Sequence, residues 1–214
     1  MDKIESNPLP PRLPDPVKQM FKTLAPHMGT TQELFFDNLW LTEGLLARQL
    51  AADRTTNAMV RTTTALTMFN AGIKENVVPQ RAEAKVNFRL LPGDTAELVI
   101  EHVRKVVDDP AIEITPVPWN GVPEPASIDG PGYAAISRAV KEVYPEAVVT
   151  PSLLTATTDT RHYMDVARDQ YRFHGSLIHV DQAASIHGTN EFIGVESFRN
   201  TVTVAINMLR YGSE

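Results

Sequence analysis

The sequence predicts an α/β protein made of two successive parts, an α+β part and then an α/β part. Three observations support this class. Apolar residues recur at helical spacing near the N-terminus, and segments rich in β-branched residues follow them. The last third of the chain alternates strand-like and helix-like runs, which is typical of parallel pairing. Hydrophobic residues make up 43% of the 214 residues, which suits a packed core.

Composition excludes several classes of function. The net charge of -6 argues against a nucleic-acid partner, because phosphate binding needs a basic face. The absence of cysteine excludes disulfides and thiolate metal sites, so any metal must be held by His, Asp or Glu. There is no apolar run of about 18 residues, so we expect no membrane-spanning helix. The first residues do not form a signal peptide, and we expect a cytoplasmic location.

The N-terminal region predicts two helices. Residues 1–16 contain five prolines and cannot hold regular structure for long. Helical spacing then predicts a helix over 16–28 and a second over 31–51. The aromatic and leucine residues of these helices are interpreted as core, since no charged cluster or cofactor motif interrupts them.

Two strands, a helix and a third strand are expected next. Residues 60–69 alternate as a strand does, and a turn at Asn70–Gly72 follows. The second strand, 82–91, places Ala84, Val86 and Phe88 on one face. Asp94 or Thr95 is expected to cap a helix that ends at Val107, with 111–117 as the third strand. This order is most of a ferredoxin-like split β-α-β arrangement.

A proline-rich crossing over 116–125 predicts a domain boundary after residue 117, which gives domains of 1–117 and 118–214. The second domain is expected to hold helices over 132–144, 159–166 and 195–211, and strands over 147–155 and 170–174. Two strands are too few for an open sheet that buries both faces. The second domain is therefore interpreted as the C-terminal part of a larger domain whose other strands are not in this chain.

Two pairs of polar residues are candidates for substrate binding. Asn76 precedes the second strand and Arg89 lies near its end, and an amide and a guanidinium that converge can hold a carboxylate. The alternative is a solvated strand face with a turn-forming Asn. Thr157 and Arg161 follow an expected strand, and such strand ends line ligand clefts. Here the alternative is a helix cap made by Thr158 or Asp159.

His187 lies in the loop Ser185–Ile193, with Glu191 four residues on and an amphipathic helix after it. Such a loop can present an imidazole to a metal, although lone histidines are more often structural. A metal site built by this chain alone would need further ligands from one of two sets. These are His174 and His179 with His187, or Asp159, His162 and Asp165, and neither has a standard ligand spacing.

Four segments together resemble the C-terminal half of the lid-bearing zinc exopeptidases. They are Lys74-Glu-Asn-Val-Val-Pro79, Asn87-Phe-Arg-Leu-Leu-Pro-Gly93, Thr157-Thr-Asp-Thr-Arg-His162 and Ser185-Ile-His-Gly-Thr-Asn-Glu-Phe-Ile193. The family includes aminoacylases, glutamate carboxypeptidases, Gly-Xaa carboxypeptidases and succinyl-diaminopimelate desuccinylases. The resemblance covers roughly residues 5–211. It implies a lid with a helical insertion, followed by the C-terminal portion of an α/β zinc-peptidase catalytic domain.

The resemblance also implies roles for particular residues. Asn76, Arg89 and Arg161 match residues that contact the substrate, and Thr157 matches a residue of a catalytic turn that can hold the developing oxyanion. His187 matches a ligand of one zinc ion of a pair. The chain has Thr155-Ala156 where glycines are frequent in the family. It lacks the family's His-x-Asp-x-Val-Pro-like segment, its Glu-Glu pair and its lid histidine, so at most one zinc ligand is expected.

We therefore expect part of a zinc-dependent metallopeptidase or amidohydrolase that cleaves peptide or N-acyl amino acid amide bonds. Because the general base is missing, the isolated chain is expected to be inactive. A homodimer through the lid is expected as well, since the small sheet has an edge open to pairing. The alternative is a non-catalytic module for dimerisation or for binding a small carboxylate.

Overall fold

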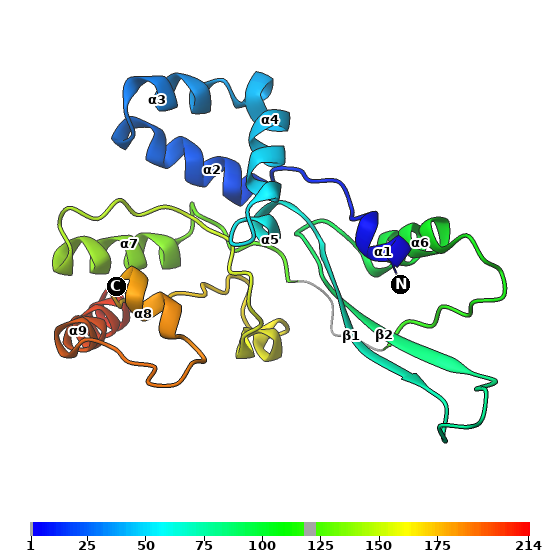
Figure 1. The fold of residues 1–214 in the computed structure, drawn as a ribbon. Coiled ribbons are helices and arrows are strands. Elements are labelled where there is room, and N and C mark those ends of the chain that lie inside the picture. The colour runs from blue at the N-terminus through cyan, green and yellow to red at the C-terminus, as the bar shows by residue number, and fades with distance from the viewer. Residues whose placement is uncertain (1, 118–122) are drawn as a thin grey trace. The chain divides into compact units, whose positions relative to one another are not determined.

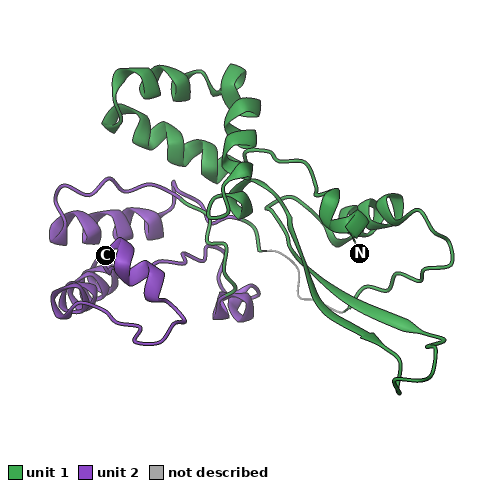
Figure 2. Cartoon of the chain, viewed as in Figure 1, with its two compact units in different colours: residues 1–124, 152–157 green, residues 125–151, 158–214 purple. Residues whose placement is uncertain are grey.

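Two units divide the chain in the computed structural model, which describes residues 2–117 and 123–214 (Figures 1 and 2). Unit 1 comprises Met1–Glu124 with Ser152–Thr157, and unit 2 comprises Pro125–Pro151 with Thr158–Glu214. The boundary expected after residue 117 adjoins residues 118–122, which lie outside the described residues. Helices combine with one antiparallel sheet, so the expected mixed α/β class is confirmed.

Helices dominate the first part of unit 1. After α1 (Asp2–Ser6), the proline-rich residues 7–14 are irregular, as expected. The helix expected over 16–28 is α2 (Asp15–Leu24) continued by the 3-10 turn η1 (Ala25–His27). The helix expected over 31–51 is divided into α3 (Thr30–Asp37) and α4 (Leu39–Ala52), with α5 (Asn57–Val60) after it. The break falls at Asn38, whose backbone is not helical and whose side-chain amide donates to the Leu34 carbonyl at 2.8 Å.

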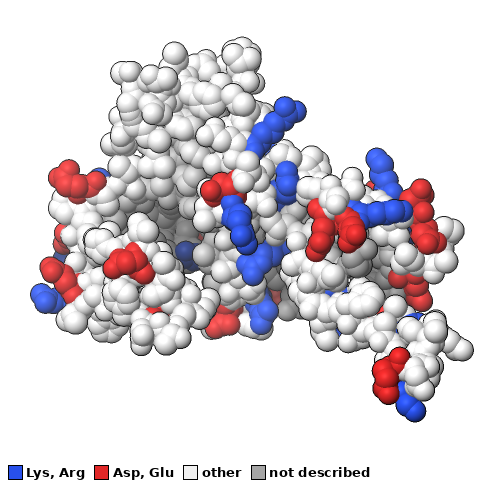
Figure 3. Space-filling view, viewed as in Figure 1, with Lys and Arg blue, Asp and Glu red and all other residues white. Residues whose placement is uncertain are grey.

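One side of these helices forms a core and another side stays exposed. Phe21 stacks on Phe36 with ring centroids 4.7 Å apart. Around this pair is a buried cluster of Leu13, Val17, Ala25, Leu39, Leu46, Ala47 and Val60. On the exposed side, Trp40 is 80% accessible, with Leu34, Leu41 and Leu45 also open. The surface over α3 that faces the viewer in Figure 3 shows no charged side chain.

Strands β1 (Thr63–Ala71) and β2 (Ala82–Arg89) form an antiparallel hairpin. The register runs from Thr63 opposite Arg89 to Ala71 opposite Ala82, with a bulge between Leu66 and Met68. The side chains of Ala84, Val86 and Phe88 are half-buried and their neighbours are exposed, as the alternation predicts.

Helix α6 (Ala96–Val107) follows the sheet and packs against α1. Thr95 caps it by accepting a hydrogen bond from the Leu98 amide at 3.2 Å, so Thr95 rather than Asp94 is the cap. The second core cluster forms here, from Ile4, Leu9, Val99 and Val103, with Phe88 and Leu90 of the sheet side packed against it.

The third expected strand, 111–117, does not form: these residues are irregular in the described structure. Ile114 still packs against the second core cluster. Pro110 and Pro116 have no amide hydrogen to donate to a ladder, so this segment gains its contacts by apolar packing rather than by strand pairing.

Unit 2 is helical in its described residues. It contains α7 (Pro131–Val143), the 3-10 turn η2 (Asp159–Tyr163), α8 (Val180–Ser185) and α9 (Val195–Gly212). Its core is a cluster of Ile136, Ala139, Val140 and Val204 between α7 and α9. Gly175 lies so close to α9 that a Cβ there would come within 2.6 Å of Val204.

The strands expected over 147–155 and 170–174 do not form, and both segments run as irregular chain. Tyr171 anchors the second of them, since its hydroxyl donates to the Ser127 carbonyl at 2.6 Å. A strand needs a neighbour to satisfy its backbone groups, and the described residues of unit 2, which holds 147–151 and 170–174, offer none; residues 152–155 belong to unit 1 but do not join its sheet. These expectations failed for lack of pairing partners.

Helix α9 is apolar on two opposite sides. Val204 is fully buried on the side that packs against α7. The opposite side carries a stripe at helical spacing, Phe198, Val202, Ile206 and Leu209, of which Leu209 is 77% exposed. A helix that is apolar on both sides is typical of a buried layer, so unit 2 leaves one of its core-forming surfaces uncovered. Among the described residues, no helix combines the length and hydropathy needed to cross a membrane.

Candidate functional site

Arg89 is the last residue of β2 and pairs with Thr63 across the sheet. Its side chain is exposed, on the face of β2 opposite Ala84, Val86 and Phe88. The guanidinium Nη1 donates a hydrogen bond to the backbone carbonyl of Thr155. Arg89 therefore contacts the segment that carries Thr157, two residues further on, and both belong to unit 1.

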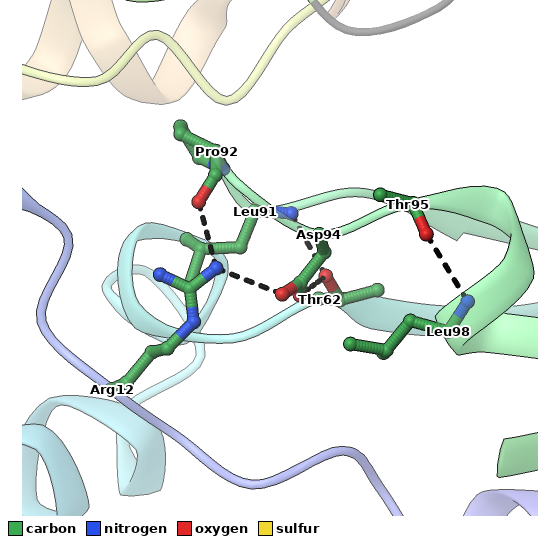
Figure 4. A network of polar contacts seen from close by, with 7 residues as sticks. All are labelled: Arg12, Thr62, Leu91, Pro92, Asp94, Thr95 and Leu98. Carbon is green, nitrogen blue, oxygen red and sulfur yellow. Dashed lines mark hydrogen bonds and ion pairs between the residues drawn. The ribbon is translucent and has the colours of Figure 1, made fainter.

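A polar network fixes the end of β2 next to Arg89 (Figure 4). The Leu91 amide donates to the hydroxyl of Thr62 at 2.8 Å, and that hydroxyl donates to the Asp94 carboxylate. Arg12 donates to the other oxygen of Asp94 and to the Pro92 carbonyl, at 2.8 and 2.7 Å. Thr62 and Leu91 are buried, so the hydrogen bond between them forms inside unit 1, whereas the two contacts of Arg12 are exposed.

Sequence reasoning missed this network. Asp94 is considered above only as a possible helix cap, and Arg12 and Thr62 are not singled out at all. The partners are 32 and 82 residues from Asp94, so no local spacing could have indicated them. One sequence signal points to it: Asp94 and Thr95 can each cap a helix. Because Thr95 makes the cap, the carboxylate of Asp94 can bind Thr62 and Arg12 instead.

Asn76 does not lie beside Arg89. It is in the exposed connection after the Ala71–Ala82 pair, whereas Arg89 is at the other end of the hairpin. At about 3.3 Å per residue, the seven steps from Ala82 to Arg89 span about 23 Å. The convergence expected of these two side chains is therefore not present within this chain.

Thr157 and Arg161 lie on either side of the boundary between the two units. Thr157 is exposed and ends the segment assigned to unit 1. In unit 2, Thr158 occupies the position before η2 without capping it, because its hydroxyl pairs with the Thr160 hydroxyl at 2.7 Å. The cap expected from Thr158 is thus not formed. Arg161 is exposed and its Nε donates to the neighbouring His162 ring at 3.2 Å.

His187 lies in a tight loop with an uncommon backbone. Its φ is 63°, and Asn190 in the same loop also has a φ of 63°. The carboxylate of Glu191 accepts from the His187 backbone amide at 3.1 Å, and the Gly188 amide donates to the Ser185 carbonyl at 2.8 Å. A left-handed histidine costs conformational energy, and such costs gather at functional positions. The carboxylate fixes the loop while the imidazole stays exposed.

The described residues do not build a complete metal site. No group of three or more His, Cys, Asp or Glu side chains among them is arranged to hold a metal ion, and this covers both alternative sets named above. A catalytic zinc ion takes about three protein ligands and keeps one position for water. Since the described residues contain no such group, they do not by themselves fit a catalytic zinc ion.

Comparison with known proteins identifies the family. Residues 6–115 match the family model described as "Peptidase dimerisation domain". A "Probable carboxypeptidase S-like 2" of Dictyostelium discoideum is 31% identical over 98% of this chain and 40% of its own length. The "N-fatty-acyl-amino acid synthase/hydrolase PM20D1" of Mus musculus is 34% identical over 94% of this chain and 41% of its own length.

A third relative is more distant. "Carboxypeptidase S" of Saccharomyces cerevisiae is 27% identical over 64% of this chain and 29% of its own length. The chain spans about two fifths of the length of the first two relatives. No solved structure matches the chain significantly. On the match of more than half its length to the dimerisation domain, the chain belongs to the M20 peptidases, the lid-bearing exopeptidases that its sequence resembles.

Proposed function

We propose that the chain is the lid and C-terminal part of a zinc-dependent amidohydrolase that cleaves peptide or N-acyl amino acid amide bonds. The observation that carries the proposal is the alignment of nearly the whole chain with less than half of two longer relatives. One of these is named as a carboxypeptidase and the other as an N-fatty-acyl-amino acid synthase/hydrolase. Both names describe chemistry at an amide bond next to a free carboxylate.

In this proposal residues 1–117 are the lid and dimerisation domain with a helical insertion, and 118–214 are the C-terminal portion of the catalytic domain. The second apolar side of α9 supports the division. In a complete α/β domain a helix lies against a sheet, and the stripe Phe198, Val202, Ile206 and Leu209 offers the surface for one. The irregular segments 147–151 and 170–174, both in unit 2, would then become strands of that sheet when their neighbours are present.

Each candidate side chain has a distinct task in the proposed site. Arg89 and Arg161 would hold the free carboxylate of the substrate, which a planar guanidinium can do with two parallel hydrogen bonds. Thr157 would help to stabilise the developing oxyanion. Asn76 would also bind substrate, although its distance from Arg89 means that the two do not grip one carboxylate in a single chain. His187 would be this chain's one ligand to zinc.

The test is a metal and activity assay on the purified chain. We expect no hydrolysis of N-acetyl-amino acids or dipeptides with added zinc, and weak zinc binding, because a single imidazole lacks both the other ligands and the general base. His187→Ala is the matched variant and His162→Ala is the control. Turnover that survives repurification and disappears only in His187→Ala would show that the chain is a complete enzyme.

A complementation experiment tests the positive half of the proposal. The part of the slime-mould relative outside the aligned region is co-expressed with this chain. Formation of a complex that binds zinc and hydrolyses an N-acyl amino acid is expected if the chain supplies the lid and the C-terminal elements. If a zinc-loaded complex forms but turns over neither class of substrate, the proposed function is wrong.

A second candidate is a dimerisation module without catalysis, and the description of the matched family model favours it. The connection of the hairpin exposes Ile73 at 97% and Val78 at 88%, and β1 exposes Phe69. Apolar side chains grouped at such a position are typical of contact surfaces. Light scattering of the purified chain is expected to give the mass of a dimer, and a monomer at high concentration would contradict a homodimer through the lid.

A further inference from the structure

The segment Ser152–Thr157 belongs to the lid unit although the residues on both sides of it belong to unit 2. Leu153 is half-buried and packs against the core cluster formed by α2, α3 and α4. This apolar contact fixes the segment near its start. Thr155, Ala156 and Thr157 are exposed, so apolar packing does not fix the rest of the turn.

Arg89 supplies the second point of attachment. Its guanidinium Nη1 donates to the Thr155 carbonyl, across 66 residues of sequence. The strand end that carries Arg89 is itself held firmly. Arg89 pairs with Thr63, and two residues later the buried Leu91 is bound through Thr62 to Asp94.

We propose that Arg89 is a positioning residue that holds the Thr155–Thr157 turn on the lid. The relevance of this turn to catalysis rests on the proposed function, but the positioning itself does not. A guanidinium has five N–H donors in a planar fork, and the contact to Thr155 uses one. Within the described residues the guanidinium donates through Nη1 alone, which leaves the Nε and Nη2 edge for a carboxylate. One side chain can therefore hold the turn that carries Thr157 and bind the substrate at the same time.

The consequence is that the segment is attached to the rest of unit 1 at two points, Leu153 and Thr155. Thr155 and Ala156 stand where the resemblance implies frequent glycines, so their backbone has fewer accessible conformations than glycine would have. Fixing such a turn costs less conformational entropy than fixing a glycine turn, and the hydrogen bond from Arg89 supplies one restraint on it. Without that bond, Leu153 alone restrains the segment and the residues after it are free to reorient.

The experiment measures backbone order in the 214-residue chain by ¹⁵N relaxation. In the wild type we expect order parameters of about 0.85 for the Ala156 and Thr157 amides, as in rigid backbone. In Arg89→Ala they should fall below about 0.6, the range of flexible backbone. In Arg89→Lys they should stay near the wild-type value, because an ammonium can still donate one hydrogen bond to the carbonyl.

Lys85→Ala is the matched control, since Lys85 lies on the same exposed face of β2 and its loss should leave the turn unchanged. Order parameters within β2 should not change in any of the variants, which shows that the effect is local. Wild-type values already below about 0.6, no change in Arg89→Ala, or an equal fall in Lys85→Ala would each overturn the positioning role. None of these outcomes depends on turnover, so an inactive complementation complex would refute the proposed function without touching this result.

Discussion

Asp94 gives the sharpest test of how unit 1 holds together. Its carboxylate accepts from the Thr62 hydroxyl with one oxygen and from Arg12 with the other, the latter at 2.8 Å. The Asp94 side chain is 11% exposed and the Arg12 side chain is 42% exposed. We therefore expect the two halves of the network to differ in energy, with the buried half worth more than the ion pair.

The magnitude follows from these burials. A hydrogen bond to a charged acceptor contributes about 1.5–3 kcal/mol, and this is the value of the Thr62 contact. The ion pair with Arg12 contributes up to about 1 kcal/mol, because the exposed guanidinium is screened by solvent. Asp94→Ala should therefore lower the free energy of unfolding by about 1.5–4 kcal/mol. Asp94→Asn keeps an acceptor for Thr62 and should cost about half as much.

The assay is urea unfolding followed by far-ultraviolet circular dichroism, with the change read from the midpoint at constant slope. Arg12→Ala is the control and should cost no more than about 1 kcal/mol. In the double variant, the coupling between Arg12 and Asp94 should be no larger than the cost of Arg12→Ala, because Arg12 also donates to the Pro92 carbonyl. The reasoning is refuted if Asp94→Ala unfolds within about 0.5 kcal/mol of the wild type, or if Arg12→Ala is as damaging as Asp94→Ala.

Three further results are expected. His187→Gly should raise the free energy of unfolding by about 1 kcal/mol, because glycine adopts the left-handed backbone of this position without strain. A lower melting temperature in this variant would contradict the expectation. Gly175→Ala should lower the free energy of unfolding by about 1–3 kcal/mol, because the added methyl group overpacks against Val204. Gly44→Ala, in open space within α4, should raise it by about 0.5–1 kcal/mol. Equal effects of the two substitutions would refute the packing argument. Burial, and then the proximity of Tyr171, raise the pKa of Tyr133, so its contribution to stability is full below about pH 10 and is lost as pH rises through the folded value. The pKa values of Tyr171 and Tyr211 are raised as well, so tyrosinate absorbance should show late-titrating phenols whose amplitude falls by that of one phenol in Tyr133→Phe. An unchanged late amplitude in Tyr133→Phe, or titration of all phenols at about pH 10, would exclude the raised pKa of Tyr133.

Local signals in the sequence were enough for several elements. Helix α6 begins at a Thr cap, α9 follows a long helical period, and the alternation in β2 places Phe88 on the packed side. These features depend on residues within one or two turns of each other. The strands expected over 111–117, 147–155 and 170–174 depend instead on neighbours that sequence does not reveal, and none of them formed.

The candidate site divides in the same way. The position of Arg89 at the exposed end of a strand could be read from the alternation of side chains. Its contact with Thr155 could not be predicted, because the acceptor is a backbone carbonyl, which every residue type has. The convergence of Asn76 with Arg89 was an inference from a motif, and the length of the hairpin places them at opposite ends. The left-handed backbone of His187 also had no signal, since only glycine marks such positions plainly.

The bulge in β1 makes the two outer edges of the hairpin unequal. Between Leu66 and Met68 an extra residue changes the alternation of outward-pointing N–H and C=O groups. A strand that pairs with the outer edge of β1 would therefore lose its hydrogen-bond register at the bulge. Strand β2 keeps one unbroken order from Ala82 to Arg89. A hairpin with two equivalent edges can add copies without end, and its assembly can grow into a fibre. A hairpin with one continuous edge can be satisfied by a single partner strand, so this one residue favours closed pairs over open growth.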